Sequence, residues 1–527
     1  MLARLKAPSG PKAWVDLNYL TFPAQLEVEA KMETSIVTSL FLVGLVLVLS
    51  LLYQIVYNLF LSPLRQIPGP LLARVTSYWL IFVDITGNRT STIHRLHQKY
   101  GKAVRIGPSE VSLSNIESIK EIYGQQTSFM KAPIYETMSL PPLGIFSLTD
   151  RRAHSQRRKY LSHAFSQSNL LDTEPLIAQH IQKLHDKIKA GLNKPLDMLV
   201  LFRLLAFDIV GDLFLGQSFG GLDSPKVPGF LHDMDQAFLL GGIESSFPWV
   251  FAALTRIPIP SLQHFLASRK RLIQYGKASL NKYVAEYGRD SGRRDLLTKV
   301  LSVKDDSGTS VLSDLETYTE IGNLVFAGTV DTTSTTLTYL FWELCRHPVW
   351  QERLRAELKS HVADPSTTPS WNAVQELPLL DAVVNEALRL HPAAPASLPR
   401  RTPLGGKLLG GYFIPEDVVV SMQCYTTQRE SDVFYKPDEF LPERWLEADK
   451  ISGEMRELFM PFSKGSRACL GKNMAMMELK MTTATLLKSY SVRSAPTTTD
   501  DSMTMQDHFL VLPKGGRCDL IFEEVAK

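Results

Sequence analysis

Cysteine is scarce in this chain, and this scarcity excludes several classes of protein that depend on cysteine. The 527 residues include four cysteines with no CxxC pair and no Cys/His cluster, which excludes a disulfide framework and a zinc site of the usual spacing. No GxGxxG motif follows a predicted strand and no Walker loop is present, so we expect the chain to bind no nucleotide itself. The formal net charge of +3 is too small to indicate nucleic-acid binding.

Linkers and internal repeats are missing from most of the chain. No proline-, glycine- or serine-rich stretch divides residues 71–527, so we predict one large domain there. Residues 103–106 and 110–113, separated by a Gly-Pro pair, predict a hairpin, and residues 407–422 predict a second strand group. Helical periodicity dominates elsewhere, which predicts a mainly α fold with small β-sheets.

A long apolar run near the start predicts a membrane segment. Residues 35–61 contain no charged side chain and, as a helix rising about 1.5 Å per residue, would cover a bilayer core. We predict a transmembrane anchor there, followed by a proline-rich hinge over 62–70. A buried core helix is the alternative. Arg65 and Arg74 follow the run whereas Lys31 alone lies close before it, which favours a cytosolic catalytic domain.

The segment before the anchor, residues 1–34, has mixed charges and no apolar periodicity. The segment Met32-Glu33-Thr34-Ser35 leads directly into the apolar run, so Met32 resembles a natural start of translation. We hypothesise that translation begins at Met32, so that the preceding residues are not translated. The alternative is that they form a disordered lumenal tail.

Residues 462–471 have the sequence FSKGSRACLG, which fits the pattern F-x-x-G-x-R-x-C-x-G at every fixed position. A thiolate in an apolar interior needs a metal, a positive charge or backbone N–H groups to stabilise it. Gly465 and Gly471 allow the backbone to fold closely around the Cys469 sulfur, and Arg467 supplies a fixed cation. The alternative is that Cys469 is an ordinary buried thiol, which leaves the other fixed positions unexplained.

This loop resembles the haem-binding loop of the cytochrome P450 family. The resemblance implies that Cys469 is the thiolate ligand of a haem b iron, a ligand that favours O–O cleavage. It also implies that Phe462 covers the sulfur side of the ring, that Gly465 shapes the loop, and that Arg467 pairs with a haem propionate. The fold of the family, a mainly helical catalytic domain, agrees with the pattern of the chain.

A threonine-rich segment carries a second resemblance. Residues 313–345 predict one long helix, and residues 327–336 within it have the sequence AGTVDTTSTT, although threonine is a poor helix former. Asp331-Thr332 is similar to the acid–alcohol pair of the same family, which implies that Asp331 supplies protons and that Thr332 hydrogen-bonds dioxygen. Thr329 stands where the family has a small glycine, and its effect stays open. A threonine-rich core helix is the alternative.

Three residues match a structural network of the family. Glu386 and Arg389 form an E-x-x-R pair on one face of a predicted helix, and Arg444 lies in a later Pro-Glu-Arg-Trp segment. The resemblance implies that these side chains form a buried network near the haem and take no part in its chemistry. A surface salt bridge is the alternative for the E-x-x-R pair.

Haem propionates need cations, and three further residues are candidates. His154 and Arg158 are four residues apart on a predicted helix that resembles a W-x-x-x-R segment of the family. His154 stands where the family usually has Trp, so it departs from the pattern. Arg400 is the third candidate, and solvated surface charge is the alternative for each of them.

The substrate pocket is expected, from position within the family, to be mostly apolar, which predicts a lipophilic substrate. Core packing is the alternative for each of its residues. The expected pocket residues are Tyr135, Met138, Leu140, Leu143, Phe146, residues 394–398, Met505 and Phe509.

The resemblance implies a membrane-anchored haem-thiolate monooxygenase that inserts one oxygen atom from O2 into a lipophilic small molecule. Similarity to fungal members implies a step in natural-product biosynthesis, with electrons from NADPH through a separate NADPH–cytochrome reductase. The expected location is the endoplasmic reticulum membrane, with the catalytic domain facing the cytosol. The alternatives are an O2-independent haem-thiolate isomerase or dehydratase, and a non-enzymatic haem-binding protein. The identity of the substrate, the regiochemistry and the pathway stay open.

Overall fold

The computed structural model separates into two compact units, Met1–Arg65 and Gln66–Lys527. The residues that it describes run from 22 to 525, with gaps at 140, 225–228, 290, 294, 305–310, 325–329, 363–366, 448 and 450.

The first unit is built around one long helix, α1 (Phe22–Val56), which continues into a π-helical turn at Tyr57–Leu61. Its stretch Met32–Leu61 has 30 residues and a mean hydropathy of 2.6, so its length and composition suffice to cross a membrane. None of that stretch is buried, and this disfavours the core-helix alternative. Helix α1 also includes residues 22–34, which the sequence pattern assigns to a separate segment.

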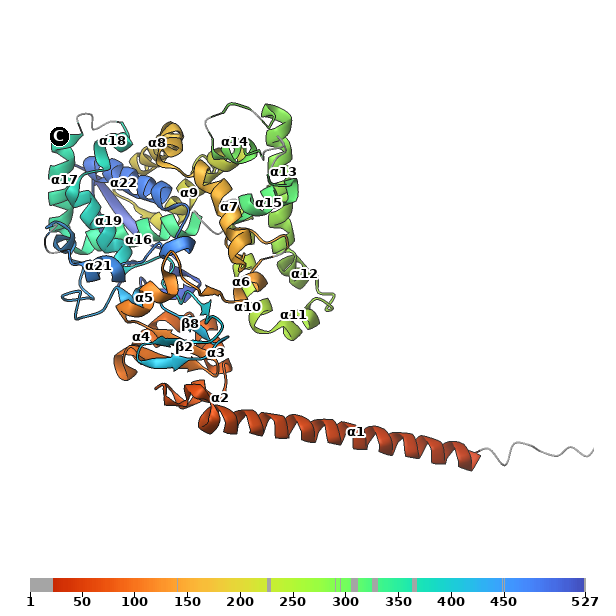
Figure 1. The fold of residues 1–527 in the computed structure, drawn as a ribbon. Helices are drawn as coiled ribbons and strands as arrows, with labels where there is room; N and C mark the ends of the chain where they lie inside the picture. Colours follow the sequence, from red (N-terminus) through yellow and green to blue (C-terminus); the bar gives the residue numbers. More distant parts are fainter. Residues whose placement is uncertain are drawn as a thin grey trace, which may run out of the picture. The chain divides into compact units, whose positions relative to one another are not determined.

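The second unit is mainly helical, as predicted, and the sheet that contains β2 and β8 lies below most of the helices in Figure 1. Its helices are α2 (Leu71–Val75), α3 (Tyr78–Ile85), α4 (Arg89–Tyr100), α5 (Ile116–Tyr123), α6 (Ile134–Thr137), α7 (Arg151–Ala164), α8 (Gln167–Ala190), α9 (Met198–Leu215), α10 (Gly229–Ser246), α11 (Pro248–Leu254), α12 (Pro260–Leu266), α13 (Ser268–Tyr287), α14 (Leu296–Leu301), α15 (Asp314–Gly322), α16 (Val330–Arg346), α17 (Pro348–His361), α18 (Trp371–Val374), α19 (Pro378–Leu390), α20 (Cys424–Thr427), α21 (Gly453–Leu458) and α22 (Lys472–Ser489).

The strands form small sheets in the orders β1-β2-β8-β5-β3, β4-β12-β9, β10-β11 and β6-β7. Their bounds are β1 (Ala103–Gly107), β2 (Glu110–Leu113), β3 (Met130–Lys131), β4 (Pro195–Asp197), β5 (Arg400–Arg401), β6 (Lys407–Leu409), β7 (Tyr412–Ile414), β8 (Val419–Ser421), β9 (Tyr490–Ser494), β10 (Met505–His508), β11 (Leu510–Pro513) and β12 (Asp519–Glu524).

Both predicted strand groups are confirmed. Strands β1 and β2 pair antiparallel, with Ala103 opposite Leu113, and the β6–β7 hairpin is followed by β8. Strand β8 then pairs in parallel with β2, where Glu110 is opposite Val419. This pairing ties the start of the unit to a segment about 300 residues later in the chain.

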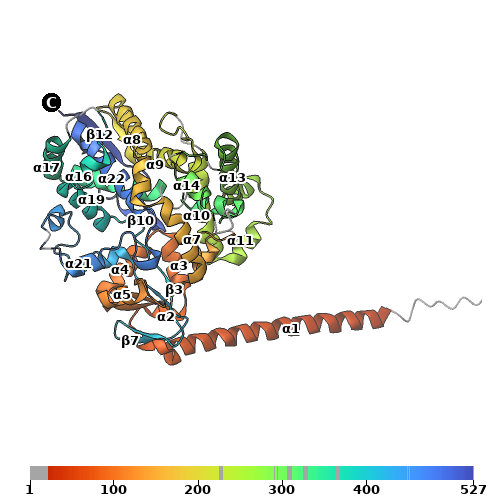
Figure 2. The same ribbon diagram turned by 45° about the horizontal axis from the view of Figure 1, so that its top comes forward.

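Helix α16 lies at the centre of the helical part, in contact with α9, α19 and α22. Figures 1 and 2 both show α16 beside α19 and α22. From Val330 to Leu344 its residues are buried with the exception of Thr332. A helix that is buried on all sides must satisfy its polar side chains internally, so the partners of its polar residues carry information about function.

The long helix predicted over residues 313–345 corresponds to two described helices, α15 and α16. Helix α15 begins with a capping box, in which the Ser313 side chain accepts from the Glu316 N–H and the Glu316 carboxylate accepts from the Ser313 N–H. Residues 325–329 between the helices, and with them Thr329, lie outside the described residues.

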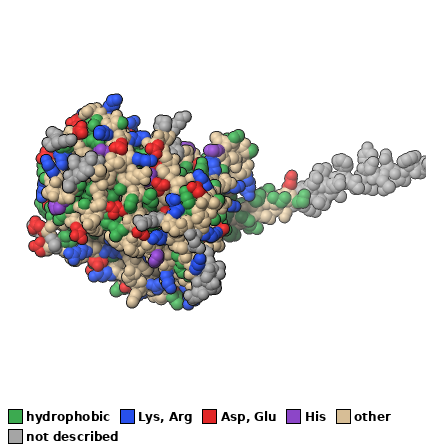
Figure 3. All heavy atoms as spheres, turned by 90° about the horizontal axis from the view of Figure 1, so that it is seen from above, with side chains coloured by type: hydrophobic (Ala, Val, Ile, Leu, Met, Phe, Trp, Pro, Cys, Tyr) green, Lys and Arg blue, Asp and Glu red, His purple; other side chains and the backbone are tan. Residues whose placement is uncertain are grey.

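Charged side chains of both signs are interspersed over the face shown in Figure 3, in keeping with the small net charge of +3. Many form exposed ion pairs, such as that between Arg493 and Glu523, whose Nε and Oε1 are 2.9 Å apart. Exposed pairs of this kind contribute about 0–1 kcal/mol each to the free energy of unfolding. The buried networks therefore matter more for stability than the surface charges do.

Candidate active site

The loop that contains Cys469 leads directly into helix α22. A 3-10 turn at Gly465–Arg467 precedes the cysteine, and the Cys469 N–H donates to the Phe462 carbonyl at 2.8 Å. Helix α22 begins three residues after Cys469, with Gly471 at its N-cap. The N-terminus of an 18-residue helix carries partial positive charge, which favours a thiolate nearby.

The four cysteines differ in their surroundings. Cys469 is exposed, whereas Cys424 and Cys518 are buried and Cys345 is half-buried. Burial raises the pKa of the Cys345 and Cys424 thiols to about 12, so neither supplies a thiolate at neutral pH. Desolvation raises the pKa of the Cys469 thiol. The Gly471 N–H and the charges of Arg158 and Lys472 lower that pKa. A bound metal cation would complete that stabilisation of the thiolate.

Gly465 is required by the packing of the loop on the end of helix α5. Its φ is +66°, in the left-handed region that favours glycine, and a Cβ there would lie 1.9 Å from the Tyr123 carbonyl oxygen. Gly471 has a φ of −85° and no atom within 4 Å of a Cβ position, so packing does not require glycine there, although the Gly471 N–H approaches the Cys469 sulfur.

The variant Gly465→Ala should therefore destabilise the loop by about 2 kcal/mol or more, because it combines a strained φ with a backbone collision. Urea unfolding of the full-length protein, followed by circular dichroism, would measure the loss. Gly453→Ala is the matched control, since Gly453 has open space at its Cβ position. Equal unfolding midpoints for the two variants would contradict the prediction.

Four of the predicted cofactor-binding side chains meet at one cavity of about 300 Å³. Helix α7 contributes His154 and Arg158, strand β5 contributes Arg400, and the cysteine loop contributes Arg467. Arg158 Nη1 also donates to the Ala468 carbonyl at 2.7 Å, so the cavity adjoins Cys469. The structure thus brings together residues that lie more than 300 positions apart in the sequence.

Three of the cations around this cavity, Arg158, Arg400 and Arg467, have no carboxylate partner among the described residues, whereas Lys464 pairs with Glu457 at 3.2 Å. The guanidinium groups of Arg158, Arg400 and Arg467 donate to backbone carbonyls instead. Burial and the neighbouring Arg400 lower the pKa of Arg467 to about 10. Burial, Arg400 and Arg467 also hold the pKa of the Lys131 ammonium well below its usual range. Such a group of half-buried positive charges favours the binding of anionic groups.

His154 has a different character from its neighbours. Burial and the charges of Arg467 and Arg158 lower its pKa to about 3, so the imidazole is neutral at physiological pH. It can take part in a hydrogen bond to a ligand in the cavity but adds no positive charge there. Lys131, which the sequence analysis does not single out, is buried and adds an amine near His154, Arg158 and Arg467.

Asp331 does not line this cavity, but pairs with an arginine on helix α9. Its Oδ1 accepts from Arg203 Nε at 2.9 Å, and Arg203 Nη2 reaches Asp235 Oδ1 at 2.6 Å. Burial raises the pKa of the Asp331 carboxyl and Arg203 opposes that rise. The sequence holds a signal for this partner, because Arg203 is the one basic residue in the otherwise apolar stretch of α9.

Thr332 is half-buried, and it is the one residue from Val330 to Leu344 on α16 that is not buried. Its carbonyl accepts from the Thr336 hydroxyl at 2.9 Å. Such side-chain bonds to the preceding turn loosen the regular ladder of a helix.

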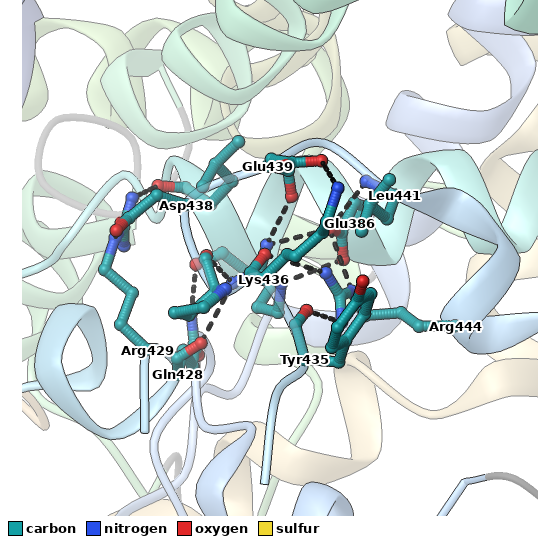
Figure 4. Close-up of polar contacts among 12 residues, drawn as sticks. Glu386, Gln428, Arg429, Tyr435, Lys436, Asp438, Glu439, Leu441 and Arg444 are labelled. Carbon is teal, nitrogen blue, oxygen red and sulfur yellow. Dashed lines mark hydrogen bonds and ion pairs between the residues drawn. The ribbon is translucent and has the colours of Figure 1, made fainter. Parts of the chain in front are cut away.

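Glu386, Arg389 and Arg444 meet in one buried network. Figure 4 labels Glu386 and Arg444 within it. Arg389 donates from Nε and Nη2 to the two Glu386 oxygens at 2.9 and 2.8 Å. Arg444 Nε reaches Glu386 Oε1 at 3.0 Å, and Trp445 Nε1 donates to Oε2 at 2.8 Å. The side chains of Glu386 and Arg389 are fully buried, so the exposed salt-bridge alternative does not hold.

Arg389 also supports the loop that precedes Arg444. It donates to the carbonyls of Gln428 at 3.0 Å and Glu439 at 3.0 Å. Burial alone would raise the pKa of the Glu386 carboxyl, but Arg389, Arg444 and the Leu441 N–H outweigh it and lower that pKa. Glu386 is therefore ionised and fully paired in the folded protein.

The family model described as Cytochrome P450 matches residues 68–520. The chain belongs to the cytochrome P450 family. This confirms the resemblance predicted from the cysteine loop and the threonine-rich helix. Proteins of this family bind haem b with a cysteine thiolate as axial ligand.

Relatives of known name agree with this membership. Cytochrome P450 monooxygenase tazI of Aspergillus terreus is 32% identical over 479 residues, which cover 90% of this chain and 96% of the relative. Cytochrome P450 monooxygenase stcB of Emericella nidulans is 33% identical over 87% of this chain and 88% of its own length. Cytochrome P450 monooxygenase aflV of Aspergillus parasiticus is 33% identical over 90% of this chain and 94% of its own length.

The residues present fit haem b. An accessible thiol stands at the N-terminus of helix α22, and cations without carboxylate partners among the described residues surround the adjoining cavity. As an oxidoreductase, a haem-thiolate P450 needs both features. The thiolate binds the iron, and the positive charges pair with the two propionates.

Proposed function

We propose that this cytochrome P450 is a haem-thiolate monooxygenase that inserts one oxygen atom from O2 into a lipophilic small molecule, with Cys469 as the axial ligand. The observation that carries the proposal is the exposed Cys469 thiol beside the cation-lined cavity. Haem with a thiolate ligand supplies the activation of O2, because the thiolate favours O–O cleavage.

The roles proposed for the other residues follow from their positions. Arg158, Arg400 and Arg467 hold the two propionates through charge-assisted hydrogen bonds, and neutral His154 contributes a hydrogen bond. The Phe462 ring keeps water from the sulfur side of the haem, and the bond from the Cys469 N–H to the Phe462 carbonyl supports this role because it holds the two residues close together. The Glu386 network keeps the chain around the loop in one conformation.

Proton supply is proposed to run through Asp331 and Thr332. Asp331 is buried and burial raises its pKa, so its carboxylate takes up a proton more readily than an exposed aspartate does. Arg203 pairs with both Asp331 and Asp235. The Asp235 side chain is 47% exposed. When Arg203 pairs with Asp235 alone, Asp331 becomes free to exchange its proton with water. The hydroxyl of half-buried Thr332 orients that water toward dioxygen.

A lipophilic substrate is supported by an aromatic cluster among the expected pocket residues. Tyr135 and Phe146 pack edge to face at 5.5 Å, and Phe146 packs on Phe509 at 5.8 Å. Phe509 has a φ of +80°, a strained conformation for a bulky residue that favours a functional role for its placement. Leu140, another expected pocket residue, lies outside the described residues.

The setting of the reaction is proposed from the rest of the chain. The sequence holds no nucleotide-binding motif, so electrons come from NADPH through a separate NADPH–cytochrome reductase. The stretch Met32–Leu61 anchors the protein in the endoplasmic reticulum membrane, and the basic residues after it favour a cytosolic catalytic domain. The fungal origin of the named relatives supports a step in natural-product biosynthesis.

Thr332→Ala tests this proposal. Without the hydroxyl, NADPH consumption should continue while peroxide replaces product, and product formed per NADPH should fall about 100-fold, within the range that positioned proton transfer contributes. The measurement is the ratio of peroxide to NADPH with the full-length protein, a reductase and O2.

Thr338→Ala is the matched control, because the Thr338 hydroxyl is buried on the same helix and donates to the Ser334 carbonyl at 2.7 Å. It should leave the ratio unchanged. Equal ratios for both variants would place the relay elsewhere, and turnover independent of O2 would favour the isomerase or dehydratase alternative.

A further inference from the structure

A short loop before helix α7 is bound by a buried carboxylate that the proposed reaction does not use. The side chain of Glu320, on helix α15, is fully buried, and its Oε1 and Oε2 accept from the Ile145 N–H at 2.9 and 3.1 Å. The same carboxylate accepts from Arg157 Nη1 on α7 at 2.6 Å. Ile145 belongs to residues 144–149, which we call the pocket loop because Phe146 is among the expected pocket residues.

The start of the pocket loop lies against α15 with its backbone. Gly144 is buried, and a Cβ there would lie 1.8 Å from the Asn323 side-chain nitrogen and 3.2 Å from Glu320 Oε2. The Gly144 carbonyl accepts from the N–H groups of Ser147 at 2.9 Å and Leu148 at 3.0 Å, so a tight turn follows. The absence of a side chain at Gly144 therefore allows the next N–H to reach the Glu320 carboxylate.

The other end of the pocket loop is bound by the cysteine loop. Arg467 Nη1 donates to the Leu148 carbonyl at 2.5 Å, and Arg467 Nη2 donates to the Thr149 carbonyl at 3.0 Å. Phe146 lies between these two attachments, and its ring contacts the rings of Tyr135 at 5.5 Å and Phe509 at 5.8 Å. The two attachments together fix the segment that carries the Phe146 ring.

Two carboxylates of α15 bind Arg157, but they differ in what else they contact. Arg157 Nη2 pairs with Glu316 Oε1 at 2.5 Å, and the Glu316 side chain is 31% exposed. Among the described residues, Glu320 alone of the two accepts from the pocket loop. Burial raises the pKa of the Glu320 carboxyl, and the Ile145 N–H and Arg157 lower it by less. A carboxylate buried at such a cost adds little net stability, but it restricts the positions of its partners.

We propose that Glu320 is a positioning residue that determines substrate specificity. Its hydrogen bond to the Ile145 N–H holds the pocket loop on α15, so that the Phe146 ring forms a fixed apolar wall of the substrate pocket. A fixed wall selects substrates by the shape of their apolar part, because a ring that cannot move aside excludes groups that do not fit. The role in selection rests on the proposed function, whereas the fixed position of the loop does not.

Hydrogen–deuterium exchange of the full-length holoprotein tests the position of the loop. In Glu320→Leu the Ile145 amide loses its acceptor, so the peptide that contains it should exchange about tenfold faster, the effect of one lost hydrogen bond to a charged group. Glu320→Gln keeps an acceptor oxygen and should exchange like the parent protein.

Glu316→Gln is the matched control, because it weakens a partner of Arg157 and leaves the bond to Ile145 in place. The Soret band of the reduced carbon monoxide complex shows whether each variant is folded. If Glu320→Leu lacks that band, Glu320→Asp, whose shorter side chain withdraws from Ile145, takes its place. The proposal is overturned if the variant without the bond exchanges no faster than Glu316→Gln, or if Glu320→Gln exchanges as fast as that variant.

Binding of two nitrogen bases to the holoprotein tests the role in selection. Imidazole and 4-phenylimidazole both bind iron through nitrogen, and the second also carries an aromatic ring that can pack on a fixed apolar wall. Glu320→Leu should raise the Kd of 4-phenylimidazole about tenfold, the size of one aromatic contact, and change that of imidazole less than about twofold. Equal changes for the two bases would overturn the role in selection. If the parent protein oxidises no lipophilic compound with NADPH and O2 while the exchange pattern holds, the proposed function fails and the fixed loop remains.

Discussion

Cys469→Ala should abolish the thiolate-type Soret band of the reduced carbon monoxide complex, together with all NADPH-dependent oxidation. Cys469 is the one exposed cysteine, it stands at the N-terminus of α22, and it adjoins the cation-lined cavity. Alanine removes the sulfur and leaves the packing of the loop intact, since the Cys469 N–H bond to Phe462 belongs to the backbone. The reduced carbon monoxide difference spectrum of the purified full-length protein measures the loss.

Cys345→Ala is the control for that experiment. Burial holds the pKa of the Cys345 thiol at about 12, so it supplies no thiolate and its removal should leave the band in place. A retained band in Cys469→Ala would overturn the assignment of the ligand. A lost band in Cys345→Ala would show that the spectrum reports general damage to the fold.

Arg389→Met should lower the free energy of unfolding by about 3–5 kcal/mol, the usual cost of removing one partner from a buried ion pair. The substitution leaves Glu386 fully buried with Arg444, Trp445 and the Leu441 N–H as its remaining donors. It also frees the carbonyls of Gln428 and Glu439, which Arg389 now satisfies. Urea unfolding of the full-length protein in detergent, followed by circular dichroism, measures the change.

The same experiment has a pH dependence with a defined sign. The folded-state pKa of Glu386 is lowered, so its contribution to stability is present above the unfolded pKa of about 4.5 and is lost as the pH falls through the folded value. In Arg389→Met that pKa should rise, and the acid-induced loss of stability should begin at higher pH.

Arg493→Met is the matched control, because Arg493 forms an ion pair of the same kind with Glu523 at the surface. Its side chain is 58% exposed, so its loss should change the free energy of unfolding by less than about 1 kcal/mol. If Arg389→Met were as mild as Arg493→Met, the network around Glu386 would contribute little to the fold.

Local patterns in the sequence predicted local structure well. The two short runs on either side of Gly107-Pro108 predicted the β1–β2 hairpin, because a turn between adjacent strands needs no long-range information. The parallel pairing of β2 with β8 could not be predicted in this way, because it joins segments about 300 residues apart. The charge-free run predicted a helix, but not its start at Phe22, since helix ends depend on weak local signals.

The partners of the site residues were harder to predict than the residues themselves. Arg203 reaches Asp331 from 128 positions away, and no spacing rule links the two. The isolated arginine in an apolar helix indicated only that some partner must exist. Lys131 likewise joins the cation cluster through the fold and not through a motif.

The sequence by itself determined the family, the cysteine loop, the acid–alcohol pair and the apolar segment, because each is a run of adjacent residues whose chemistry is local. The tertiary structure decided which charges are paired and which residues are buried. It leaves Arg158, Arg400 and Arg467 without carboxylates among the described residues, and it pairs Asp331 with Arg203. Pairing and desolvation depend on surroundings from distant parts of the chain, and these exist only once the chain has folded.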